Sequence, residues 1–344
     1  LVVSSVHPPD DPRIREKTIG SLQTEWDVTY ATRLPGPTSK EGITWLALRG
    51  GRMARLFTAS MLILSRTWDV VSVHDPELLP AALVRSLLGR STVFDLHEDV
   101  PAQMLDKSWI PSPLRRPLAW TFGMMLRVSE RAILITVAED SYGHLLSGSP
   151  AVIRNHLNLE GLPPPVSDTS EVAYLGDITK LRGASAAVAF ARGAGLPLVM
   201  VGRRQPELQR ELESIAGSDV AIEFTGHLDH ESALARVATA TVGVSPLHDV
   251  GNYSHSMPTK VLEYLALGVG AVVSDLPGTR SVVEGLPGVA FVRPGDDAAW
   301  EEAGHDLDLR RLREEARSGV EEVRSRFAWP DDEVRDVYRR AFAG

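Results

Sequence analysis

Short apolar runs alternate with longer amphipathic stretches along the whole chain. The short runs are rich in Val, Ile and Leu, which is typical of buried strands, whereas apolar residues in the longer stretches recur at helical spacing. Strand–helix alternation predicts right-handed βαβ units and parallel sheets with helices on both faces. The predicted strands are 1–6, 69–73, 92–95, 132–137, 151–153, 172–175, 198–201, 220–224, 241–244, 271–274 and 289–292, and the predicted helices are 77–88, 113–129, 184–193, 205–215, 230–239 and 296–325.

The pattern breaks once, around residue 160. The segment 161–170 has no periodicity and contains three consecutive prolines, which is typical of an interdomain linker. A chain of 344 residues is long enough for two α/β domains. We therefore predict two Rossmann-like, doubly wound domains facing a central cleft, over 1–156 and 157–327, with a C-terminal helix at about 328–344 that packs back on the first domain.

Composition narrows the functional classes. The formal net charge is −9, and the whole acidic excess lies after residue 160, which argues against a nucleic-acid partner. The absence of cysteine excludes disulfides and thiol catalysis and favours a reducing compartment, so we expect a cytoplasmic protein. No stretch approaches the roughly 18–20 uninterrupted apolar residues of a membrane span. The segment 33–66 is locally basic, which is compatible with peripheral contact with the inner face of a membrane.

Two apolar stripes, 56–64 and 120–126, occur at helical spacing. We expect both to face the core rather than to bind a cofactor. The alternative for the arginine-flanked helix 49–66 is that it lies on an anionic membrane surface.

The stretch from His255 to Asp275 is the most informative part of the chain. It predicts a turn that enters a helix at Pro258, a stop at Gly268 and a short apolar strand. The free N–H groups and the dipole of a helix N-terminus favour phosphate. Lys260 and Glu263 are three residues apart and share one side of this helix, so one can bind phosphate and the other sugar hydroxyls. The pair fits a nucleoside diphosphate better than it fits a metal.

Other polar residues directly follow predicted strands, where ligands bind in doubly wound sheets. The loop 176–183 combines glycines with cations suited to a diphosphate, although an ordinary βα turn with solvated charges is equally compatible. Asp75 has a structural alternative as the cap of a helix that begins at Pro76, and the polar cluster around His97 has one as a structural hydrogen-bond network. The remaining candidates on the first domain are His7, Arg13, His74 and Asp99, and on the second Gly176, Lys180, Arg182, Gly202, Gly226, His227, His255, Met257, Pro258 and Thr259.

Several motifs of other enzyme classes are absent from the sequence. It contains no Gly-x-Ser-x-Gly elbow, Walker loop, Gly-x-Gly-x-x-Gly fingerprint or Ser/His/Asp triad, which removes support for hydrolases, NTPases and dehydrogenases. It has neither Asp-x-Asp nor metal-ligand spacing of His, Cys and Asp, so we expect no metal. We also expect no cofactor besides a nucleotide-diphosphate sugar acting as co-substrate.

Taken in order, the motifs resemble those of glycosyltransferase family four, the retaining enzymes with the GT-B fold. The similar segments cover nearly the whole chain and are specific for the family, but not for the sugar. They are 7–13, 73–80, 94–99, 176–183, 224–227 and 246–275.

The resemblance implies roles for particular residues. Glu263 would bind the ribose, cations of the 176–183 loop would hold the diphosphate, and His97 would contact the donor sugar beside the reacting carbon. Two positions depart from the family pattern: His255 stands where a glutamate is usual, and Asp177 where an arginine is usual, with Arg182 in place of the usual lysine. Both departures bear on the identity of the donor sugar.

The sequence thus predicts a metal-independent, retaining hexosyltransferase. It would move a sugar from a nucleotide-diphosphate donor to an acceptor, which could be a glycan, a lipid-linked molecule or a small molecule such as a natural product. His97, Arg182, Lys260 and Glu263 would carry the chemistry. The alternatives are another GT-B enzyme, a nucleotide-sugar epimerase or a phosphorylase, and a partner subunit with a defective donor site. The donor base and the oligomeric state stay open.

Overall fold

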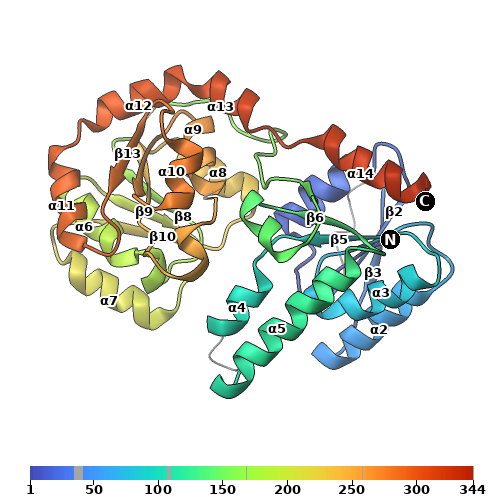
Figure 1. The fold of residues 1–344 in the computed structure, drawn as a ribbon. Coiled ribbons are helices and arrows are strands. Elements are labelled where there is room, and N and C mark those ends of the chain that lie inside the picture. Colours follow the sequence, from blue (N-terminus) through green and yellow to red (C-terminus); the bar gives the residue numbers. More distant parts are fainter. Residues whose placement is uncertain (35–41, 107–109, 168, 258, 344) are drawn as a thin grey trace. The chain divides into compact units, whose positions relative to one another are not determined.

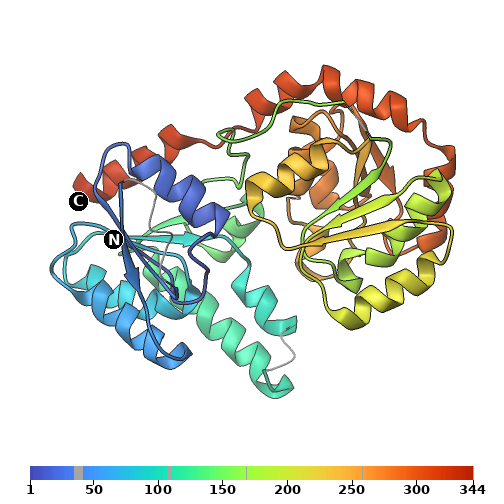
Figure 2. The ribbon, with the colours of Figure 1, turned by 180° about the vertical axis from the view of Figure 1, so that it is seen from behind.

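A computed structural model describes residues 1–34, 42–106, 110–167, 169–257 and 259–343 of the chain. The chain forms two compact units, each an α/β layer structure (Figures 1 and 2). The N-terminal unit comprises Leu1–Asn155 and Trp329–Gly344, and the C-terminal unit comprises His156–Ala328. The chain returns to the N-terminal unit at Trp329, so its last helix belongs to that unit.

The N-terminal unit is built on a seven-stranded parallel sheet in the order β3-β2-β1-β4-β5-β6-β7. The predicted doubly wound fold is therefore confirmed, but the sequence pattern missed β2 and β3. Thr and Ala alternate with larger residues in both, which weakens the apolar signal. The strands are β1 (Val2–Val3), β2 (Val28–Thr32), β3 (Ile43–Ala47), β4 (Val71–Val73), β5 (Thr92–Leu96), β6 (Leu134–Val137) and β7 (Ala151–Val152).

Helices cover both faces of this sheet. A first set of helices packs on one face of the sheet through residues such as Ile14, Leu22 and Val337. A second set packs on the other face through residues such as Ile63, Ala82 and Leu126. The first set is η1 (Pro12–Ile19), α1 (Gly20–Leu22) and α14 (Asp331–Ala343), and the second is α2 (Arg52–Leu64), α3 (Leu79–Leu87), α4 (Val100–Asp106) and α5 (Ser112–Ser129). The short helical turn η2 (Pro76–Leu78) precedes α3, and η3 (Asp140–Leu145) lies between β6 and β7.

The C-terminal unit is built on a six-stranded parallel sheet in the order β10-β9-β8-β11-β12-β13. Each of its strands overlaps a predicted one. The four central strands are almost entirely buried because helices cover both faces of the sheet, whereas the two edge strands are partly exposed. The strands are β8 (Val172–Leu175), β9 (Leu198–Val201), β10 (Ile222–Gly226), β11 (Val242–Ser245), β12 (Gly270–Ser274) and β13 (Val289–Val292).

The prediction of a single helix over 296–325 is wrong. The structure has three helices there, because Asp308 caps a new helix by accepting a hydrogen bond from the Arg311 N–H at 3.0 Å, and Gly319 ends it. The helices of the C-terminal unit are η4 (Lys180–Arg182), α6 (Ala184–Ala194), α7 (Pro206–Ala216), α8 (His230–Ala238), η5 (Gly251–Ser254), α9 (Thr259–Ala266), α10 (Pro277–Val283), α11 (Asp297–Asp306), α12 (Leu309–Ser318) and α13 (Val320–Arg326). In the part of the chain that the structure describes, no helix is long and apolar enough to cross a bilayer.

Candidate active site

Three glycines stand at the carboxyl ends of adjacent strands in the C-terminal unit. Gly176, Gly202 and Gly226 follow or end β8, β9 and β10, and all three have positive φ angles, 111°, 155° and 78°. A Cβ atom on Gly202 would lie 2.0 Å from the carbonyl oxygen of Gly176, so only glycine allows the strand ends to come this close. The backbone therefore carries no side chains at the edge of the sheet where a ligand would bind.

Two cations converge beside Gly176. A Cβ atom on this glycine would lie 3.5 Å from the Arg182 Nη1 and 3.8 Å from the Lys260 Nζ. Arg182 comes from η4, after β8, and its guanidinium lies over the Tyr253 ring, 5.8 Å from the centroid. Lys260 comes from the first turn of α9, and its Nζ lies 4.7 Å from the centroid of the Tyr174 ring. Two separate helices thus aim positive charge at one strand end.

The ammonium group of Lys260 is buried and has no hydrogen-bond partner among the described residues. Burial and then the positive charge of Arg182 lower the pKa of Lys260 from 10.5 to about 7. Burial also opposes the charge of Arg182, but the hydrogen bond and proximity of Tyr253 raise the pKa of its guanidinium. A buried ammonium beside a permanent cation is unfavourable unless an anion neutralises both. This arrangement suits a diphosphate.

Glu263 lies one turn after Lys260 on α9 and is largely buried, with 15% of its side chain exposed. Its carboxylate oxygen is 3.7 Å from the Nε2 of His230, the first residue of α8. Asp229 caps that helix by accepting from the Ser232 N–H at 2.9 Å. The negative charge of Glu263 is close enough to Lys260 to counter in part the lowering of the pKa of its ammonium, and the carboxylate oxygens can accept hydrogen bonds from hydroxyl groups.

Some predicted residues of this unit lie elsewhere. The structure does not bring Lys180 to the cation pair, because its ammonium is exposed and bonds Glu211 on α7 at 2.7 Å. Asp177, one of the two departures from the family pattern, pairs with exposed Arg203 at 3.2 Å. The carboxylate of Asp177 thus already has a cationic partner of its own.

The other predicted residues surround the start of α9 or the end of β10. His255 is exposed, and its backbone packs so closely on Gly278 that a Cβ there would lie 2.4 Å from the His255 carbonyl carbon. Met257 is half-buried against the core, Thr259 begins α9, and His227 is exposed after β10. Pro258 lies outside the described residues.

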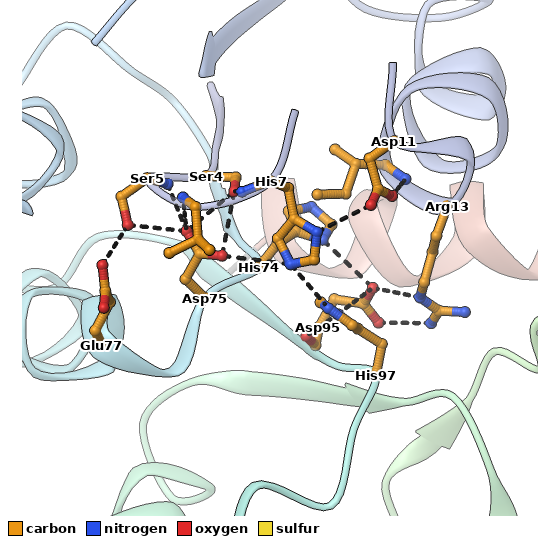
Figure 3. A network of polar contacts seen from close by, with 12 residues as sticks. Ser4, Ser5, His7, Asp11, Arg13, His74, Asp75, Glu77, Asp95 and His97 are labelled. Carbon is orange, nitrogen blue, oxygen red and sulfur yellow. Dashed lines mark hydrogen bonds and ion pairs between the residues drawn. The ribbon is translucent and has the colours of Figure 1, made fainter. Parts of the chain in front are cut away.

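The N-terminal unit carries a second polar cluster, built around Asp95 at the end of β5 (Figure 3). Arg13 of η1 donates two hydrogen bonds to this carboxylate, from Nε and Nη2, each at 2.8 Å. Thr136 donates a third at 2.9 Å, and the His74 Nδ1 lies 3.4 Å away. Burial opposes ionisation, but the adjacent Arg13 overrides it and holds the pKa of Asp95 well below its usual value. Asp95 is therefore a fixed, neutralised anion.

Two histidines face each other above this carboxylate. The Nε2 atoms of His7 and His97 are 3.3 Å apart, and the Nδ1 of His97 lies 3.2 Å from the carbonyl oxygen of Asp95 (Figure 3). Burial, together with the charge of Arg13, lowers the pKa of His97 to about 4, so its ring is neutral near pH 7. Burial also disfavours a charged His7, but the hydrogen bond from its Nδ1 to Asp11, at 2.9 Å, raises its pKa. Because the His97 Nδ1 faces a carbonyl oxygen and must donate, the Nε2 of the neutral His97 ring is an acceptor, and His7 can donate to it when its own ring is protonated, the form that Asp11 favours.

Asp75 does not cap the helix at Pro76, so that structural alternative is wrong. Its buried carboxylate turns instead toward the loop after β1, where the Ser4 hydroxyl donates to it at 3.0 Å and the Val6 N–H at 3.3 Å. Asp99 is not part of the cluster. It accepts from the Ala102 N–H at 2.9 Å, at the start of α4.

The structure brings together three side chains of the types that bind metals, although their spacing in the sequence is not that of a metal motif. Among the described residues, ligand atoms of His74, Asp95 and His97 lie within 4.8 Å of one another. Arg13 and Thr136 already bond the oxygens of Asp95, and a fixed guanidinium beside a site disfavours a divalent cation. The donor set therefore fits a metal poorly.

Four residues of the two clusters were missed by the sequence analysis. Asp95 appeared only as part of segments 92–95 and 94–99, and Asp11 only as part of segment 7–13. Tyr174 and Tyr253 gave no local signal, because a tyrosine that supports a cation through its ring is recognised only when the two come into contact. Asp95 could have been recognised from the sequence, because a charged residue inside an otherwise apolar, buried strand is unusual.

Residues 179–307 match the family model described as Glycosyl transferases group 1, and this match includes Arg182, Lys260 and Glu263. Together with the two Rossmann-like units, it defines the class: the chain is an enzyme, a glycosyltransferase with the GT-B fold, and part of its C-terminal unit is similar to the group 1 family.

Individual relatives agree with this class. Glycogen synthase from Mycobacterium tuberculosis is 25% identical over 94% of this chain and 80% of its own length. Sucrose-phosphate synthase from Thermosynechococcus elongatus superposes with a TM-score of 0.75 and 16% identity, covering 99% of this chain and 98% of that one. HepE from Anabaena, solved with UDP-glucose, gives a TM-score of 0.71 and 11% identity over 100% and 99% of the two chains. At these identities, the structural matches establish the fold.

Proposed function

We propose that this glycosyltransferase belongs to family four and moves a sugar, with retention of anomeric configuration, from a nucleoside-diphosphate donor to an acceptor hydroxyl. The observation that carries the proposal is the convergence of the half-buried Arg182 and the buried, unpartnered ammonium of Lys260 on Gly176, at the end of β8. A diphosphate supplies the negative charge that this site lacks. HepE, which has the same fold, was solved with UDP-glucose, and this supports a nucleotide sugar as the proposed donor class.

The proposed step requires no metal ion. The bond between the anomeric carbon and the diphosphate oxygen breaks while a bond to the acceptor oxygen forms on the same face of the sugar. The proton of the acceptor hydroxyl passes to the departing phosphate oxygen. Charge that develops on the diphosphate is stabilised by Arg182, by Lys260 and by the first turn of α9, in a site that excludes water from the ammonium.

Glu263 and His97 have separate roles in this proposal. Glu263 accepts hydrogen bonds from the ribose hydroxyls of the donor. His97 contacts the reacting sugar as a neutral imidazole, and its Nε2 must exchange the hydrogen bond from His7 for one from a sugar hydroxyl. His7 and Asp75 keep the ring environment fixed, since both belong to the network that holds the loop after β1.

The acceptor is proposed only as a class: a glycan, a lipid-linked molecule or a small molecule that offers a hydroxyl. A cytoplasmic enzyme with peripheral membrane contact is consistent with a lipid-linked acceptor. Lys40 and Glu41 of the basic segment 33–66 lie outside the described residues, whereas its helical part is α2.

The test is donor binding followed by product analysis. We expect at least one of UDP, GDP and dTDP to bind, and a ligand at 100 times its dissociation constant to add about 2.7 kcal/mol of apparent stability. Arg182→Gln should weaken this binding, whereas the matched control Arg203→Gln, an exposed arginine paired with Asp177, should not. Proton NMR of the product then reports the anomeric configuration. Absence of binding by all three nucleotides would leave the defective-subunit alternative, and donor conversion without acceptor would indicate an epimerase.

A further inference from the structure

Three helices on one face of the N-terminal sheet are apolar on both of their sides. Helices α2, α3 and α5 pack on the sheet through residues such as Ile63, Ala82 and Leu126. A helix of a globular protein normally presents polar residues on the side away from the core. These three instead present large apolar side chains there, with exposed fractions of 73% for Met53 and 69% for Trp120. The sequence analysis expected the stripes of α2 and α5 to face only the core, and the structure shows that each has an outer half as well.

The exposed residues form stripes along each helix. On α2 they recur at every fourth position, and on α5 Trp120 and Met124 have the same spacing, so each stripe lies on one side of its helix. Helices α2 and α3 are direct neighbours, and α3 and α5 flank β5 in successive crossovers on the same face of the sheet (Figure 1). We call this the outer apolar surface, represented by Met53, Phe57, Met61, Leu87, Trp120 and Met124.

The charged residues within the three helices have one sign, although Glu77, just before α3, pairs with Arg52 of α2. Helices α2, α3 and α5 contain six arginines and no aspartate or glutamate. Arg85 is buried, but Arg116 and Arg127 on α5 are exposed. The three helices thus lack carboxylates, although the whole chain has a net charge of −9. Exposed apolar groups flanked by arginine, with a tryptophan among them, are the composition of a surface that lies in the interface of an anionic bilayer.

We infer that the outer apolar surface docks the N-terminal unit on an anionic lipid bilayer. The apolar side chains enter the boundary between head groups and acyl chains, while the arginines meet lipid phosphates. A second copy of the chain is a less favourable occupant. Two such surfaces pressed together would bring arginines against arginines, with no carboxylate on these helices to pair them. The inference depends only on this unit and does not require the proposed donor chemistry.

The first test is flotation of the full chain with lipid vesicles. Vesicles of equal parts phosphatidylglycerol and phosphatidylcholine should carry the protein upward, and phosphatidylcholine vesicles should carry much less. Phe57→Gln combined with Trp120→Gln should lower the partition coefficient by roughly tenfold to a hundredfold, because two large apolar side chains no longer enter the bilayer. The matched control Ile215→Gln changes an exposed apolar residue of α7, in the other unit, and should leave binding unchanged.

The second test concerns charge and the competing occupant. Arg116→Gln and Arg127→Gln should each lower binding roughly fivefold, the equivalent of about 1 kcal/mol, whereas Arg310→Gln on α12 should have no effect. Substitutions at exposed positions should leave the circular dichroism spectrum unchanged, and the single arginine variants test the proposal even where the double variant misfolds. The inference fails if the wild-type chain ignores anionic vesicles, or binds neutral ones equally well. It also fails if sedimentation shows a dimer that the Phe57 and Trp120 changes dissociate.

Discussion

Replacing Lys260 by methionine tests the candidate donor site most directly. The side chains have similar length, but methionine carries no charge. In the nucleotide-free protein the buried ammonium of Lys260 has no hydrogen-bond partner among the described residues and lies beside Arg182, which together with burial lowers its pKa from 10.5 to about 7. We therefore expect Lys260→Met to stabilise the free protein and to abolish tight binding of the nucleoside diphosphate.

The magnitude follows from linkage. Lowering the pKa of Lys260 from 10.5 to about 7 reduces the free energy of unfolding by about 5 kcal/mol when the lysine is charged in both the folded and the unfolded chain. At pH 7, where the folded group is half protonated, the reduction is about 4 kcal/mol. Between about pH 7 and 10.5 the unfolded chain binds the proton that the folded chain lacks, so this lysine makes stability rise with pH in that window. Below about pH 7 both states are protonated, and the penalty is constant. Local relaxation reduces it, and we expect a gain of about 1–3 kcal/mol for the methionine variant at pH 7.

Differential scanning calorimetry between pH 6 and 10 measures this effect, and the pH dependence assigned to Lys260 should disappear in the variant. Nucleotide binding near pH 8 should take up a proton, because the diphosphate restores the charged ammonium; titration calorimetry in buffers of different ionisation enthalpy detects it. Lys180→Met is the matched control: this exposed lysine pairs with Glu211, so its removal should change stability by less than about 1 kcal/mol and leave affinity nearly unchanged. A methionine variant at position 260 that is less stable, and binds nucleotide as well as the wild type, would refute the reasoning.

Three further predictions concern the rest of the site. Glu263→Gln should fold normally and weaken donor binding by roughly 1.5–3 kcal/mol, the contribution of a charged hydrogen bond to the ribose; unchanged donor KM and kcat would remove this role. Activity should survive EDTA, because Arg13 and Thr136 occupy the carboxylate of the His74–Asp95–His97 group; complete loss that manganese restores would overturn the metal-free step. His97→Ala should lower kcat by a factor on the order of 10²–10³ and leave nucleoside-diphosphate affinity intact, since Arg182 and Lys260 belong to the other unit; equal losses in both would place His97 in the fold or the nucleotide pocket.

The strands and helices were predictable where the hydrophobic signal is strong. The four central strands of the C-terminal sheet, β8, β9, β11 and β12, are almost entirely buried, and all six strands of this sheet overlap predicted ones. β2 and β3 were missed because threonine and alanine dilute the pattern, and β3, with one neighbouring strand only, is half exposed. The break at Asp308 was missed because a cap between two helices of similar composition leaves the amphipathic period almost undisturbed.

The site residues were predictable as positions but not as partners. The rule that ligands meet the carboxyl ends of parallel strands directed attention to Gly176, Lys260 and His97. It could not show that Lys180 turns away to Glu211, or that Asp177 pairs with Arg203, because both depend on where a neighbouring helix or loop places an opposite charge. The periodicity of α2 and α5 likewise gave the buried stripe, while the outer apolar residues became visible only once the three helices were seen on one face of the sheet.

The two clusters differ in how their buried charges are balanced, and that difference separates their functions. In the N-terminal unit, Asp95 receives two hydrogen bonds from Arg13 and one from Thr136, so the charge is neutralised within the protein itself and the network is stable without a ligand. In the C-terminal unit, Lys260 and Arg182 leave positive charge in excess beside Gly176. Binding energy for an anion must therefore come from the C-terminal unit, whereas the neutral imidazole of His97 can add little to the affinity for a diphosphate. A group that contributes little to ground-state binding but is held in place by Asp95 and His7 is suited to act on the transition state.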